Sequence, residues 1–310
     1  MADDYFPIDF SHPAVREYMS LIRRLQVLTP LSLLANIVTV AVCSFVVHPS
    51  LGDITRWHPA SISPSVPVVA FYILAIYVLQ VGYCLLLVIV TKTETKKTVV
   101  KGVGHALVFS NWIMAAWAIS WTLQWWIPST ALLGIQALAL LYANMVLIIY
   151  HEPTFARPLD IVFIHAPMRL LFILTVGLLF PYSLLITLGH GQSPAHHDNY
   201  QWEGFAVMIS VNLVGLFIIA ARRDIVWAAG ATWVDVAVWS SEHKPAPVFV
   251  TAVIFTVFHP LTLLMATVWV TCLKSRSQGR IRLPPDEEPG RPHAQAGGRA
   301  HNGEIQSDWS

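Results

Sequence analysis

Uncharged apolar runs of membrane-crossing length recur along almost the whole chain, separated by short polar connections. Eight runs stand out, at residues 25–47, 66–90, 103–127, 130–150, 161–188, 204–221, 225–240 and 248–273. A helix needs about 20 apolar residues to cross the hydrocarbon core of a bilayer. The runs lack the alternation of barrel strands, and open sheets cannot span lipid. The pattern therefore predicts an all-α, polytopic integral membrane helix bundle with about eight transmembrane helices.

The two ends of the chain differ in composition from this apolar middle. Residues 1–24 are charged and carry no cleavable signal pattern, which predicts a cytoplasmic N-terminal arm. Residues 25–273 form the predicted transmembrane helical domain. Residues 274–310 are rich in Pro, Gly and charged side chains, a composition that cannot build a core, so they are predicted to be a disordered cytoplasmic tail.

Basic residues are distributed unequally between the two sides of the predicted bundle. Of the 19 Lys and Arg residues, sixteen fall in the arm, the tail and alternate loops, and only Arg56 and Lys244 fall in the opposite loops. Because cytoplasmic loops are enriched in Lys and Arg, this bias predicts that both termini are cytoplasmic. The same bias favours residues 225–240 as a span, although this run is the shortest and contains Asp235.

Composition also narrows the function. The chain is 55% hydrophobic and 12% charged, with a net charge of +1, so nothing suggests a nucleic-acid partner. No span contains a lysine for a Schiff base, and the chain lacks a phosphate-binding loop, an H-E-x-x-H motif and a G-x-S-x-G turn. The histidine-rich loop at 189–204 matches no defined metal spacing. We therefore expect no enzyme, no cofactor and no metal site, with the lipid bilayer as the main partner.

The segment NWIMAAWAISWTLQWW, residues 111–126, contains five tryptophans. Tryptophan usually marks the membrane interface, but Trp117 and Trp121 are expected near the middle of the third run. Trp117, Trp121 and Trp125 are each four residues apart, which predicts that they stack along one helix face. Two interpretations stay open: an aromatic core that only fills space, or a wall for a flat hydrophobic ligand.

Two charged residues fall at membrane depth, where ionisable groups are candidates for function. Asp235 lies inside its apolar run, and Arg169 lies near the start of the fifth run. Arg169 has a second interpretation, because the residues after it are long enough to cross alone and its guanidinium could then reach the cytoplasmic headgroups. His259 is expected to be a hydrogen-bonded core residue. Four amides are expected to join helices by hydrogen bonds: Asn36, Gln80, Asn144 and Asn212.

Three segments together resemble a known family: NWIMAAWAISW (111–121), FIHAPMRLLFILTVGLLFPYSLLITL (163–188) and RRDIVWAAGATWVDVAVW (222–239). They are similar to long tryptophan-rich membrane proteins, namely fungal multi-pass proteins of uncharacterised function that are distant relatives of the translocator protein/tryptophan-rich sensory family. The resemblance covers roughly residues 110–240. It implies binding or sensing of a small hydrophobic ligand such as a porphyrin or a sterol.

We therefore expect a multi-pass membrane protein that binds, senses or carries a small hydrophobic molecule. Its ligand-binding candidates are Trp117, Trp121, Arg169 and Asp235. One alternative is a proton-coupled secondary transporter that uses Asp235 as its proton site, and another is a non-catalytic membrane scaffold. Two equal halves would favour a transporter, and the sequence shows no convincing internal repeat.

Overall fold

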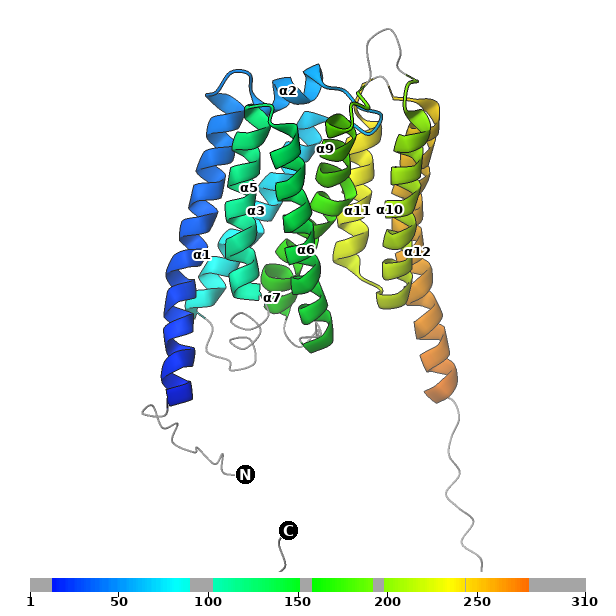
Figure 1. The fold of residues 1–310 in the computed structure, drawn as a ribbon. Coiled ribbons are helices and arrows are strands. Elements are labelled where there is room, and N and C mark those ends of the chain that lie inside the picture. The colour runs from blue at the N-terminus through cyan, green and yellow to red at the C-terminus, as the bar shows by residue number, and fades with distance from the viewer. Residues whose placement is uncertain (1–12, 90–102, 151–157, 192–197, 243, 279–310) are drawn as a thin grey trace, which may run out of the picture. The chain divides into compact units, whose positions relative to one another are not determined.

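The computed structural model describes residues 13–89, 103–150, 158–191, 198–242 and 244–278, and these residues form helices and connections without a strand (Figure 1). The chain divides into two units, residues 1–268 and 269–310. The arrangement below is that of the first unit. The all-α prediction is confirmed. The predicted disorder after residue 278 falls outside the described residues.

The membrane-crossing helices number six in the described part of the chain, not the eight predicted. By length and hydropathy the candidate spans are Ser20–Phe45, Val66–Ile89, Trp126–Tyr150, Pro158–Thr187, Gln201–Arg222 and Ala246–Cys272. The chain is therefore an integral, multi-pass membrane protein. The other two predicted runs are helical but do not qualify as spans. One of them, α11 (Ile225–Trp239), has 15 residues and is only about 22 Å long, shorter than the hydrocarbon core.

The other helix that does not qualify, α5 (Gly104–Thr122), has 19 residues but is not apolar enough. Its polar side chains Ser110, Asn111 and Thr122 are buried, so they face neighbouring helices. The run predicted to continue to residue 127 is interrupted, because the chain turns at Gln124, which has a φ of 58° in the left-handed region. The next helix, α6 (Trp126–Tyr150), begins directly after this turn.

Five helical segments pack in a closed ring in the first unit. Helix α1 (Pro13–Phe45) packs against α5, α5 against α6, and α6 against a central helix at Pro158–Thr187. The central helix packs against α3 (Val66–Ile89), which returns to α1 and closes the ring. About 61% of the central helix is buried, compared with 28–33% of the other spans, so it is the most enclosed element. We call these five segments the five-helix ring.

The central helix changes its pitch twice. It consists of α7 (Pro158–Asp160), the π-helical segment η2 (Ile161–His165), α8 (Ala166–Leu174), the π-helical segment η3 (Thr175–Leu179) and α9 (Phe180–Thr187). Pro167 and Pro181 follow the two π segments closely. Proline has no N–H to donate to the preceding turn, and a wide π turn relieves the clash of its ring with the helix.

A second group of helices packs against one side of the ring. It comprises α10 (Gln201–Arg222), α11 and the part of α12 (Ala246–Gln278) that belongs to the first unit. Helix α11 packs against α8 and α3, and Gly230 permits this close approach, since an added Cβ would lie 2.9 Å from side-chain atoms of Tyr72, Leu170 and Ile173.

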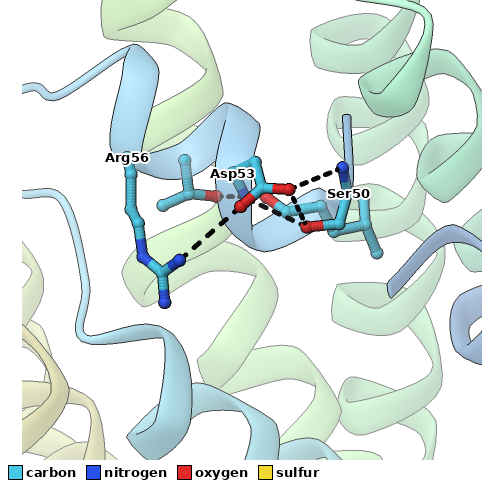
Figure 2. A network of polar contacts seen from close by, with 5 residues as sticks. Ser50, Asp53 and Arg56 are labelled. Atoms are coloured by element: carbon cyan, nitrogen blue, oxygen red, sulfur yellow. Dashed lines mark hydrogen bonds and ion pairs between the residues drawn. The ribbon is translucent and has the colours of Figure 1, made fainter. Parts of the chain in front are cut away.

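The connection between α1 and α3 carries a short surface helix, α2 (Leu51–Trp57), at one end of the bundle (Figure 1). Ser50 and Asp53 form a capping box: the Ser50 backbone N–H and hydroxyl donate to the Asp53 carboxylate over 3.1 and 2.7 Å, and the Asp53 N–H donates back to Ser50 (Figure 2). The hydrogen bonds from Ser50 lower the pKa of the Asp53 carboxyl. Arg56 lies 3.6 Å from the same carboxylate and is largely exposed.

Candidate functional site

A buried triad of polar side chains joins the three helices of the second group. The Asn212 amide on α10 donates to Asp235 Oδ1 on α11 over 2.9 Å, and His259 Nδ1 on α12 lies 3.2 Å from Asp235 Oδ2. None of the three is more than 4% exposed. A carboxylate away from water needs such partners, because an isolated charge there is very costly. Asp235 is buried, and the expected interhelical hydrogen bond of Asn212 is confirmed.

The imidazole of the triad approaches the Asp235 carboxylate through Nδ1 as an ion-pair contact, without the geometry of a hydrogen bond. His259 Nε2 is buried and makes no hydrogen bond among the described residues. It lies against Gly215 of α10, where an added Cβ would be 3.3 Å from this nitrogen and also 3.3 Å from Nε1 of Trp227. The three helices approach closely here because Gly215 has no side chain. A carboxylate–imidazole pair of this kind can hold a proton between two otherwise buried groups.

The second charged residue found from the sequence, Arg169, belongs to a buried ion pair. Its guanidinium on α8 lies 2.5 Å from Asp224 Oδ2, and both side chains are about 5% exposed. Asp224 also caps α11, since its Oδ1 accepts the backbone N–H of Trp227 over 3.1 Å. The interpretation in which Arg169 reaches the headgroups is therefore wrong for this structure. Asp224 was missed, although an Asp just before an apolar run is a common helix-start signal.

The tryptophans of α5 form an aromatic cluster with neighbours from two other helices. Trp117 and Trp121 have ring centroids 5.9 Å apart, and Trp121 lies 5.1 Å from Trp126 of α6 and 5.5 Å from Tyr182 of α9. Trp117 is 8% exposed and Trp121 2%. The predicted third member, Trp125, is 57% exposed because α5 ends at Thr122, and Trp126 takes its place.

The indole nitrogen of Trp117 is a buried donor without an acceptor in the described part of the chain. Its neighbour Tyr182 does have an acceptor, because the Tyr182 hydroxyl donates to the backbone oxygen of His58 over 2.9 Å. The His58 ring in turn packs edge-on against Trp126, with centroids 4.8 Å apart. The aromatic cluster therefore combines a large flat apolar surface with one unused hydrogen-bond donor.

The amides predicted to join helices do so in three of four cases. Asn36 of α1 donates to Asn111 of α5 over 2.9 Å, Asn212 bonds Asp235, and the amide of Asn144 on α6 reaches the backbone oxygen of Met168 at 3.4 Å. Gln80 is the exception, because neither atom of its amide has a hydrogen-bond partner although it is 1% exposed. Gln136 of α6, which the sequence analysis did not single out, is in the same state.

Two apolar grooves open on the surface of the described structure. One, of about 610 Å³, lies along α3 and ends at Trp233 of α11, and the other, of about 520 Å³, lies between α10 and α12. Their lining is almost entirely apolar, as expected for surfaces in contact with lipid. Neither groove includes Trp117, Trp121, Arg169 or Asp235. Of these four sequence candidates, Trp117 and Trp121 contact each other, whereas Arg169 and Asp235 are each paired with another residue.

The fold and its buried polar groups define a multi-pass membrane helix bundle with polar contacts inside it. Residues 26–268 match the TSPO-like protein family. This segment is well over half of the chain, and the chain belongs to the TSPO-like protein family. The match extends beyond residues 110–240, where the sequence resemblance was seen, and the likeness to fungal proteins stays a prediction. No curated protein and no solved structure matches the sequence.

Proposed function

We propose that this TSPO-like membrane protein binds a small hydrophobic molecule, which it senses or carries, and that Trp117 and Trp121 form part of the binding surface. The observation that carries the proposal is the buried indole N–H of Trp117, which has no acceptor within the described structure. Buried tryptophan N–H groups usually find a partner. A ligand that stacks on the aromatic cluster and offers an acceptor atom would supply it. The role is non-catalytic.

Replacing Trp117 by phenylalanine should weaken ligand binding while leaving the fold intact. The change removes the N–H and part of the ring, and a single hydrogen bond contributes about 0.5–1.5 kcal/mol net, which corresponds to roughly a tenfold loss of affinity at most. Binding is measured by calorimetric titration of purified protein with porphyrin and sterol panels. Trp121→Phe should weaken binding too, through lost ring area.

Trp112 provides the matched control, because it lies on the same helix and is 48% exposed. Trp112→Phe should bind like the wild type. If the wild type shows no saturable binding, or if all variants bind equally well, the aromatic cluster only fills space and the chain is better explained as a membrane scaffold.

A second candidate function is proton-coupled transport, and the Asn212–Asp235–His259 triad favours it. A carboxylate and an imidazole in contact at membrane depth are typical of proton pathways in pumps and transporters. The triad lies in the second group of helices and shares no residue with the aromatic cluster. The two candidate functions therefore predict effects of mutation at different residues.

We also propose that both termini of the chain are cytoplasmic, as the distribution of basic residues indicates. In a background with Cys43, Cys84 and Cys272 replaced by serine, a cysteine at the exposed Arg56 of α2 should react with an impermeant maleimide from the non-cytoplasmic side. A cysteine introduced at Thr98, in the lysine-rich segment, should react only after permeabilisation. Reaction of both positions from the same side contradicts this orientation.

A further inference from the structure

The apolar groove between α10 and α12 begins near the first residues of both helices. Phe205 and Ile209 belong to the first turns of α10, and the α12 residues of the lining extend from Ala246, where that helix begins, to Phe255. At 1.5 Å per residue this part of α12 is about 14 Å long, close to half of the roughly 30 Å hydrocarbon core. The groove therefore has the depth of one leaflet. We call it the α10–α12 groove.

The lining of the α10–α12 groove suits a hydrocarbon chain. Thr251 is its one residue with a polar side chain, and the Thr251 hydroxyl already donates to the backbone oxygen of Pro247 over 2.7 Å. A transmembrane helix of a partner protein would continue through both leaflets, whereas the groove ends at Phe255. An acyl chain from a lipid of one leaflet matches both the length and the apolar chemistry of the groove.

A cation lies at the end where the groove begins. Lys244 precedes Ala246 by two residues, so its Cα lies within about 7 Å of the lining. The Lys244 side chain is half-buried and makes no ion pair or hydrogen bond in the described part of the chain. Burial lowers the pKa of the Lys244 amine to about 7, because the charged form loses water and gains no counter-ion. An anionic group bound here would stabilise the charged amine.

Two carboxylates lie near the same end of the groove. Glu203, in the first turn of α10, comes two residues before Phe205, and Glu242 comes two residues before Lys244; both are exposed. They would repel a headgroup with a net negative charge but attract an ammonium group. The charges at this end therefore favour a headgroup that carries a phosphate and an ammonium together.

We propose that the α10–α12 groove binds one zwitterionic phospholipid, with an acyl chain along Phe205, Val250 and Ile254 and its phosphate paired with Lys244. The site faces the bilayer and shares no residue with the aromatic cluster or with the Asn212–Asp235–His259 triad. It is therefore independent of the proposed ligand-binding function.

The test is native mass spectrometry of the full-length protein, released from micelles that contain equal amounts of dioleoyl-phosphatidylcholine, dioleoyl-phosphatidylglycerol and dioleoylglycerol. These probes share their acyl chains and differ only in the headgroup. The wild type should retain one phosphatidylcholine in preference to the other two. Lys244→Met should bind it roughly fivefold more weakly, which corresponds to about 1 kcal/mol. Lys244→Arg keeps the positive charge and should bind as the wild type does.

A second variant tests the groove itself. Val250 is 52% exposed, so Val250→Trp places a large ring in the groove without disturbing the interior. This variant should retain no phosphatidylcholine, while its melting temperature without lipid stays that of the wild type. Ala75→Trp fills the other groove, along α3, and Arg56→Met removes an exposed cation that is already paired with Asp53. Both controls should retain the lipid.

The remaining outcomes overturn the proposal in distinct ways. Equal retention of phosphatidylcholine and dioleoylglycerol, or unchanged retention in Lys244→Met, means that the headgroup is not recognised. A preference for phosphatidylglycerol excludes the zwitterionic class. Unchanged retention in Val250→Trp places the lipid elsewhere on the surface. A wild-type dimer that becomes monomeric in Val250→Trp assigns the groove to a second copy of the chain.

Discussion

Replacing Arg169 by methionine should destabilise the protein strongly, whereas the same change at Arg56 should have little effect. Removal of Arg169 leaves Asp224 about 5% exposed and without its counter-ion, and breaking a buried pair in this way costs about 3–5 kcal/mol. The Arg56–Asp53 pair has the same chemistry on the surface, with a 3.6 Å separation, and exposed pairs contribute at most about 1 kcal/mol. The measurement is the thermal unfolding of detergent-purified protein.

A double variant shows whether the unpaired carboxylate of Asp224 causes the loss of stability in Arg169→Met. Asn at position 224 removes the negative charge and still caps α11 well. Arg169→Met combined with Asp224→Asn should therefore recover most of the stability lost in the single variant. Equal shifts for Arg169→Met and Arg56→Met, or a double variant as unstable as the single one, contradict the importance of the buried pair.

His259→Phe should be the most damaging single change in the second group of helices, because it leaves Asp235 buried with only the Asn212 amide as a partner. Asp235→Asn should cost less, since an amide at this position can still accept from Asn212. The double variant should be no less stable than His259→Phe alone. Such non-additivity in a thermal-unfolding cycle identifies the two residues as a coupled pair.

The Asp235→Asn variant also tests the second candidate function, proton-coupled transport. A proton-coupled transporter that uses the triad should move protons into liposomes under a membrane potential, followed with an entrapped pH-sensitive dye. Asp235→Asn should abolish this flux while remaining folded. Flux equal to that of protein-free liposomes for the wild type, or unchanged flux in Asp235→Asn, excludes this role for the triad.

The class of helical membrane protein was predictable, because a long apolar run is stable in the hydrocarbon of a bilayer and not in water. The number of spans was overestimated, because α5 was counted as a span despite polar residues that lower its mean hydropathy, among them Ser110 and Asn111. Burial of these side chains is a tertiary property. The end of α5 at Thr122 was also missed, since the left-handed turn at Gln124 uses neither Gly nor Asn.

Individual residues of the candidate site were predictable from the sequence, but the contacts between them were not. Asp235 and Arg169 stand out because a charge in an apolar run is rare. Their partners, His259 and Asp224, come from other helices, and local spacing rules reach only three or four residues. Gln136 was missed, although it is an amide in a long apolar helix and so carries the same signal as Asn144 of that helix.

The two halves of the central helix contact different neighbours, and the π turn at η3 sets the rotation between them. Arg169, before η3, points to Asp224 at the start of α11, whereas Tyr182, after it, reaches Trp121 of the five-helix ring. One extra residue in a turn advances everything beyond it by about 100° of rotation. Removing a single residue from Thr175–Leu179 would therefore rotate one half of the central helix relative to the other, so that one of its two contacting faces would meet the wrong neighbours.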